Sequence, residues 1–125
     1  LLIAFVSHRI LLNVKLLNNI KMEKVIRDGK VAVLVSHGFG AGWYSWNTEH
    51  QQLLFSPKLV EMVEQNRNNE IDEYWVKENL GIEHVYCGGA SDLTIHWLPI
   101  GTAFEIDEYD GSESLRTIDD LVLVA

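Results

Sequence analysis

The chain has 125 residues, of which 47% are hydrophobic and 22% charged, and its net charge at pH 7 is −8. This length suits one domain with a modest core and is too short for two. The acidic balance disfavours nucleic-acid binding and attachment to anionic membranes, because both need a basic surface. A single cysteine, Cys87, cannot form an internal disulfide, so we expect a reducing compartment, the cytoplasm.

The first 21 residues differ from the rest in composition and charge. They contain no acidic residue and three basic residues, which are Arg9, Lys15 and Lys21. They therefore carry +3, and the remaining residues carry −11. Since Met22 opens an ordinary protein start, we expect residues 1–21 to be an extension, either non-native or an assembly element. Polar residues interrupt it, so it does not predict a membrane span. It also lacks the basic start and the small-residue cleavage site of a signal peptide. Residues 22–125 are expected to form one compact domain.

The domain is expected to begin with a β-hairpin over residues 25–33. Asp28-Gly29 is typical of a type I′ turn, in which both residues adopt a positive φ. The second strand includes Val31–Val35, which is almost entirely apolar and predicts a central strand. Three glycines then interrupt regular structure, Gly38, Gly40 and Gly42.

Two helices are expected next. Ser56-Pro57 is typical of a helix start, with serine as the cap and proline in the first turn. This helix is expected to end near residues 66–69. The second helix is predicted over residues 71–80, and Gly81 suits the left-handed position after its last turn.

The remaining residues predict short antiparallel strands separated by turns. Alternation and apolar runs place these strands at residues 84–87, 93–98, 103–109, 114–118 and 121–124. Strands on either side of two central helices predict a single α+β domain with a mostly antiparallel sheet.

The first glycine loop carries a local resemblance to a known catalytic family. Val33-Leu-Val-Ser-His37-Gly38-Phe39-Gly40 resembles the strand-to-loop segment of α/β-hydrolases, where a His-Gly loop supplies an oxyanion-hole amide. The family's nucleophile elbow is Gly-x-Ser-x-Gly, and this sequence contains none. The chain is also about half the size that such a fold needs. His37 is kept as a candidate acid–base residue.

The same loop has two other readings. Its amides could bind an anion. Alternatively, the glycines allow a tight, close-packed connection, and we favour this interpretation because the spacing matches no known phosphate loop. The aromatic residues of the loop are the candidate ligand- or partner-binding residues, Phe39, Trp43, Tyr44 and Trp46. The opposing reading is that one or two of them cover the edge of the core.

Two further clusters of polar residues are possible sites. A zinc site of His84, Cys87 and His96 is rejected, because residues 84 and 87 face opposite sides of a strand. We therefore predict no metal and no cofactor. An acidic run near the C-terminus is either a solvated hairpin tip, which we favour, or a patch that meets a basic partner. It contains Asp107, Glu108, Asp110, Glu113, Asp119 and Asp120.

Residues 22–118 are similar to small uncharacterised proteins of mobile DNA, encoded by phage genomes and integron gene cassettes. The similarity is carried by Lys30-Val-Ala-Val-Leu-Val…Gly38-Phe-Gly-Ala-Gly-Trp…Trp46-Asn and by Glu108-Tyr-Asp-Gly-Ser-Glu-Ser114. It implies a compact accessory protein, often oligomeric, and assigns no role to any residue.

The functional prediction is a non-catalytic protein that binds a protein partner or itself. The alternative is a small-ligand-binding protein or a minor hydrolase-like enzyme, with its pocket at the Ser36–Asn47 loop. No nucleic acid and no membrane are expected as partners, because the chain is acidic.

Overall fold

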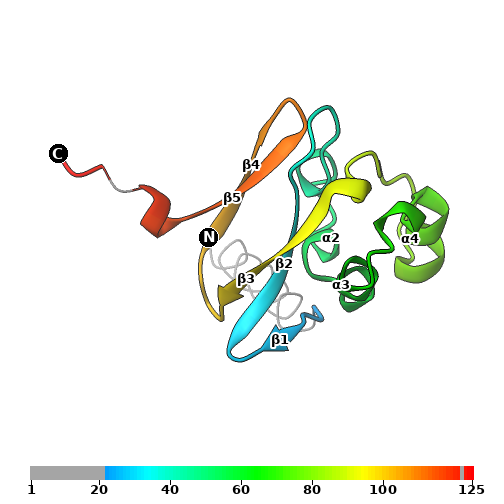
Figure 1. The fold of residues 1–125 in the computed structure, drawn as a ribbon, viewed down its shortest axis with the longest axis horizontal. Coiled ribbons are helices and arrows are strands. Elements are labelled where there is room, and N and C mark those ends of the chain that lie inside the picture. The colour runs from blue at the N-terminus through cyan, green and yellow to red at the C-terminus, as the bar shows by residue number, and fades with distance from the viewer. Residues whose placement is uncertain (1–21, 122) are drawn as a thin grey trace, which may run out of the picture.

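The computed structural model describes residues 22–121 and 123–125, and the expected extension of residues 1–21 lies outside them. Two antiparallel sheets and several helices form an α+β arrangement, which confirms the predicted fold class (Figure 1). None of the helices in this described part is long and apolar enough to cross a bilayer.

The larger sheet has three strands in the order β1-β2-β3, namely Ile26–Arg27, Lys30–Ser36 and Leu93–Pro99. β1 and β2 form the predicted hairpin. Asp28 and Gly29 both have positive φ, 51° and 74°, as a type I′ turn requires. β2 lies between the other two strands, as its apolar sequence predicted, and is paired with β3 along its whole length.

Helices cover one face of this sheet (Figure 1). They are α2 (Gln52–Phe55), α3 (Pro57–Glu64) and α4 (Glu73–Leu80). Apolar side chains from these helices pack against those of β2 and β3 in one core cluster, which includes Leu34, Leu59 and Val76. Short 3-10 turns connect the elements, and they are η1 (Tyr44–Trp46), η2 (Asn68–Glu70) and η3 (Ala90–Asp92).

The helix ends agree in part with the sequence. Gly81 follows α4 with a φ of 70°, as predicted, and Asp72 caps the start by accepting a hydrogen bond from the Trp75 amide at 2.8 Å. Ser56 precedes Pro57 at the start of α3, but its side chain makes no capping hydrogen bond, so that part of the prediction is wrong.

The second sheet is a hairpin of β4 (Phe104–Tyr109) and β5 (Ser112–Thr117), and it covers the other face of β2 (Figure 1). Val33 and Val35 of β2 point into a second core cluster that faces this hairpin. The hairpin contributes three apolar residues to it, Phe104, Ile106 and Leu115. β2 is therefore buried on both faces, and it places the loop that follows it between the two layers.

Two predicted strands are absent from the described residues. Residues 84–87 form no strand, because His84 adopts a left-handed conformation with a φ of 61°, which interrupts an extended run. Residues 121–124 were also predicted as a strand. Instead, the turn η4 spans Ile118–Leu121, and residues 123–125 have no regular structure.

Candidate functional site

A buried carboxylate joins the hairpin to the end of β2. Glu113 lies on β5 and is only 1% exposed. Its Oε1 accepts a hydrogen bond from the Ser36 amide at 3.0 Å. Its Oε2 accepts three more, from the Trp43 amide at 3.0 Å, the Ser45 amide at 2.8 Å and the Ser45 hydroxyl at 2.5 Å. Four donors on one carboxylate replace the water that burial removes.

The loop after β2 thus binds an anion that belongs to the same chain. Three amides on either side of the glycine loop, those of Ser36, Trp43 and Ser45, are turned toward Glu113. The expectation that Glu113 lies on a solvated hairpin tip is wrong. A signal for its burial was present, because Glu113 is two residues from the inward-facing Leu115, and residues two apart share one face of a strand.

Close packing explains why glycines surround this carboxylate. A Cβ on Gly111 would lie 2.2 Å from the Ala41 nitrogen, and a Cβ on Gly89 would lie 2.5 Å from the Gly42 oxygen. Both separations are far shorter than a van der Waals contact, so any side chain would force the segments apart. This agrees with the interpretation of the loop as a tight connection.

The structure separates the four predicted aromatic residues. Trp43 is 0% exposed and its Nε1 donates to the Leu53 carbonyl at 2.8 Å, so it belongs to the core and not to a binding surface. Tyr44 is half-buried against both core clusters. Trp46 is exposed and stacks on Tyr86 with ring centroids 5.0 Å apart. A single platform of three neighbouring aromatic residues is therefore not formed.

Phe39 is the most exposed of the four, at 74%, and it lies beside Tyr109 of β4, which is 79% exposed. The two residues line a hollow of about 430 Å³, which we call the Phe39–Tyr109 hollow. The other residues that line it come from the same hairpin, and they are Asp107, Glu108, Ser112 and Ser114. Sequence reasoning named Phe39 but missed Tyr109, because the two residues are 70 positions apart in the chain.

Hydrogen bonds fix the loop that carries Phe39 to the tip of the hairpin. The Gly40 amide donates to the Asp110 carbonyl at 2.5 Å, and the Ser112 hydroxyl donates to the His37 carbonyl at 2.9 Å. These contacts flank Phe39 on both sides. The backbone position of Phe39 is therefore set before any ligand or partner arrives.

His37, the candidate acid–base residue, pairs with another histidine. Its Nε2 lies 2.9 Å from Nε2 of His96 on β3, so one ring donates and the other accepts. Burial lowers the pKa of His96 below the ordinary value, and the neighbouring His37 lowers it further. Ser36, one residue from His37, donates its hydroxyl to the Gly89 carbonyl at 2.7 Å. Among the described side chains, only His96 hydrogen-bonds to the His37 ring, and no nucleophile is brought to it.

The reason given for rejecting a zinc site of His84, Cys87 and His96 is wrong, because residues 84–87 form no strand. Among the described residues, no three His, Cys, Asp or Glu side chains lie together in a way that could hold a metal ion. Cys87 is half-buried, and this burial raises the pKa of its thiol to about 11, with Asp72 and Glu73 adding to the shift. A thiol with so high a pKa is almost entirely protonated at neutral pH and is a poor nucleophile.

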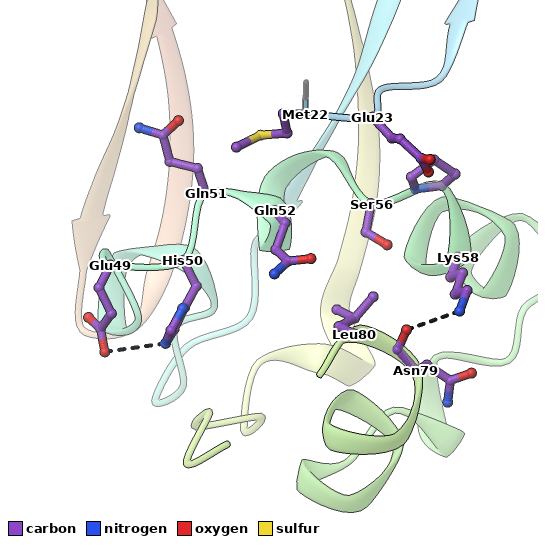
Figure 2. Close-up of a pocket in the computed structure, with 11 residues that line it drawn as sticks. Met22, Glu23, Glu49, His50, Gln51, Gln52, Ser56, Lys58, Asn79 and Leu80 are labelled. Carbon is purple, nitrogen blue, oxygen red and sulfur yellow. Dashed lines mark hydrogen bonds and ion pairs between the residues drawn. The ribbon is translucent and has the colours of Figure 1, made fainter. Parts of the chain in front are cut away.

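A wide polar hollow of about 610 Å³ lies between the start of the domain, α2 and α4 (Figure 2). Two of the side chains that line it have polar partners within the hollow. The Lys58 ammonium donates to the Asn79 carbonyl at 3.0 Å, and His50 Nε2 lies 3.6 Å from the Glu49 carboxylate (Figure 2). None of the candidate site residues proposed from the sequence lines this hollow.

Comparisons with known proteins returned nothing, since no protein family, curated protein or solved structure matches the chain. The similarity to mobile-DNA proteins therefore stays a prediction, and function must be argued from the site itself.

The Glu113 network should make a large contribution to stability. In Glu113→Gln, an amide NH₂ replaces one carboxylate oxygen. This NH₂ group cannot accept a hydrogen bond from the backbone N–H groups that it faces. Because hydrogen bonds to charged groups contribute about 1.5–3 kcal/mol each, we expect a loss of at least about 3 kcal/mol. Guanidinium denaturation measures the change. Glu105→Gln is the matched control on the exposed face of the same hairpin, and we expect it to change stability by less than about 0.5 kcal/mol. Similar effects of the two variants would contradict the role given to Glu113.

The contact between His37 and His96 should affect the pKa of His96. We expect NMR titration to give His96 a pKa below the ordinary 6.5, and His37→Ala to move it upward only in part, because burial remains. Since the folded state favours the neutral ring, His96 stabilises the fold above pH 6.5. This stabilisation is lost as the pH falls from 6.5 toward the lowered pKa. An unchanged His96 pKa in His37→Ala would show that the two rings do not interact in solution.

Proposed function

We propose that this chain is a non-catalytic binding module, and that its contact surface for another protein includes the Phe39–Tyr109 hollow. The proposal rests on one observation. Phe39 and Tyr109 are both exposed and line the same hollow, and hydrogen bonds hold the backbone of the Phe39 loop to the hairpin tip. Large aromatic side chains are enriched in protein interfaces, where they bury much area and lose little conformational entropy. An aromatic residue held in place by its backbone binds at a lower entropic cost than one on a mobile loop.

The alternative, a ligand pocket or hydrolase-like site at the Ser36–Asn47 loop, has less support. Its amides would have to stabilise an oxyanion or a bound anion, but those of Ser36, Trp43 and Ser45 donate to Glu113. The Ser36 hydroxyl is also committed, to the Gly89 carbonyl. A binding role for the surface of this loop is compatible with both facts.

A second surface favours self-association. Ile118 and Leu121 of η4 are exposed, and Leu123 and Val124 beyond them are 98% and 88% exposed. Figure 1 shows this C-terminal segment leading away from both sheets. Exposed apolar residues that follow one another along a segment are typical of a surface that another chain covers. We therefore propose that residues 118–124 form a contact between copies of the chain.

We also propose a cytoplasmic location. The support is the single cysteine, whose half-buried and unreactive thiol suits a compartment without disulfide formation.

Site-specific photo-crosslinking tests the first proposal. The photoreactive residue p-benzoylphenylalanine replaces Phe39 or Tyr109 in separate proteins, and in a control protein it replaces Tyr74, which is exposed on α4. Illumination in cells that express the protein natively should give the same discrete product at positions 39 and 109 and not at 74. Mass spectrometry then identifies the attached chain. Equal product at all three positions, or none at 39 and 109, would rule out this surface as a contact.

Light scattering tests the self-association. We expect the full chain to have the mass of a dimer or a larger assembly, and the variant Leu121→Ser/Leu123→Ser/Val124→Ser to be a monomer, since its apolar contact is removed. Ile100→Ser changes an exposed apolar residue in the turn before β4 and should leave the mass unchanged. A monomeric full chain would refute this contact.

A further inference from the structure

The Phe39–Tyr109 hollow combines aromatic rings with carboxylates. Phe39 and Tyr109 offer ring faces, and Asp107 and Glu108 line the same hollow of about 430 Å³. Aromatic faces carry negative potential, which attracts cations, and a nearby carboxylate has the same sign. Both kinds of side chain therefore favour one class of ligand, a positively charged one.

The two carboxylates differ in how far they are neutralised. Asp107 accepts a hydrogen bond from the Arg116 guanidinium at 2.7 Å, so its charge is already balanced. Glu108 Oε1 accepts from the Gly111 amide at 2.5 Å, and within the described residues no basic side chain forms an ion pair with it. Glu108 thus keeps its negative charge with only a backbone donor beside it. It lines the hollow, but it pairs with Glu113, so its side chain leaves β4 on the face opposite to Tyr109.

The charge of the surrounding hairpin has the same sign. Between residues 104 and 121 there are seven acidic residues and one basic residue, Arg116. The domain from residue 22 onward carries −11 in total. Such a field raises the local concentration of basic groups and speeds their encounter with the surface.

We propose that the Phe39–Tyr109 hollow binds a basic side chain of the partner protein, with arginine favoured over lysine. A guanidinium can stack flat on an aromatic ring while the negative field of the hairpin attracts its charge, whereas an ammonium offers a point charge without a planar face. This inference rests on the proposed binding function and adds the chemistry of the partner. The inference depends on aromatic and acidic residues that line the same hollow, and neither kind of residue alone would support it.

A titration with small probes tests the charge requirement. Acetyl-arginine methylamide is added to the full chain, and the backbone amides of Gly40, Tyr109 and Ser112 are followed by NMR. We expect these amides to shift together with a Kd on the order of 1 mM, as a single side chain gives. The citrulline analogue has nearly the same shape but no charge, and it should bind at least about tenfold more weakly. Equal binding of the two probes would overturn the inference.

Three variants separate the contribution of the aromatic ring to arginine binding from that of the charge. Phe39→Leu keeps an apolar side chain but removes the ring face, and it should weaken arginine binding by about fivefold. Glu108→Gln removes the charge but keeps an oxygen for the Gly111 amide, and it should have a similar effect. Glu78→Gln makes the same change in net charge on the exposed side of α4 and should have no effect. Retained binding in Phe39→Leu would assign the hollow to ordinary apolar contact.

The outcomes also distinguish this inference from the proposed function. Specific crosslinks at position 39 without arginine binding would leave the binding module intact and refute the basic partner. Arginine binding without specific crosslinks would establish the cation site and count against a protein contact at this surface.

Discussion

The Glu113 carboxylate is the contact on which the arrangement of the two layers depends. It is carried by the hairpin, and its four donors are carried by the end of β2 and the loop that follows. The contact joins residues about 70 positions apart, so it closes a long loop in the chain. Removing a carboxylate from water is unfavourable unless every accepting site is used, and here both oxygens accept. The hairpin can therefore sit on β2 in the register that brings Glu113 to these amides.

Several features of the site follow from this contact. The loop must turn its amides inward, which draws Trp43 into the core, where Leu53 accepts from its ring nitrogen. The segment before Trp43 must cross the hairpin tip at close range, which requires Gly111. Phe39 lies on that crossing segment, and its side chain is exposed at the surface.

Local patterns were sufficient for most of the elements. The Asp28-Gly29 turn, the apolar β2 and the alternation in β3 and β4 each depend on a few neighbouring residues, and all are present. Two of the errors depend on contacts between distant segments, whereas the missing strand at residues 84–87 follows from the local conformation of His84. An acidic turn sequence predicts solvation, but Glu113 is buried by amides that lie far away in the sequence. An apolar run predicts a strand at residues 121–124, but a strand forms only where a neighbouring edge pairs with it. For the same reason, neither the pairing of His37 with His96 nor that of Phe39 with Tyr109 could be read from the sequence.

The chemistry left at the surface follows from what the interior uses. A glycine loop after a strand is often an anion site, but in this chain the amides of Ser36, Trp43 and Ser45 beside that loop donate to an internal anion, Glu113. Two other acids of the hairpin, Asp107 and Glu108, line the same hollow as the exposed Phe39 and Tyr109. An external anion would be repelled by the negative field of these acids. A cation would be attracted by the same field, and it would also meet the exposed aromatic rings of Phe39 and Tyr109. The internal carboxylate therefore takes up amides beside the loop, while the charge that remains at the surface favours a cation over an anion.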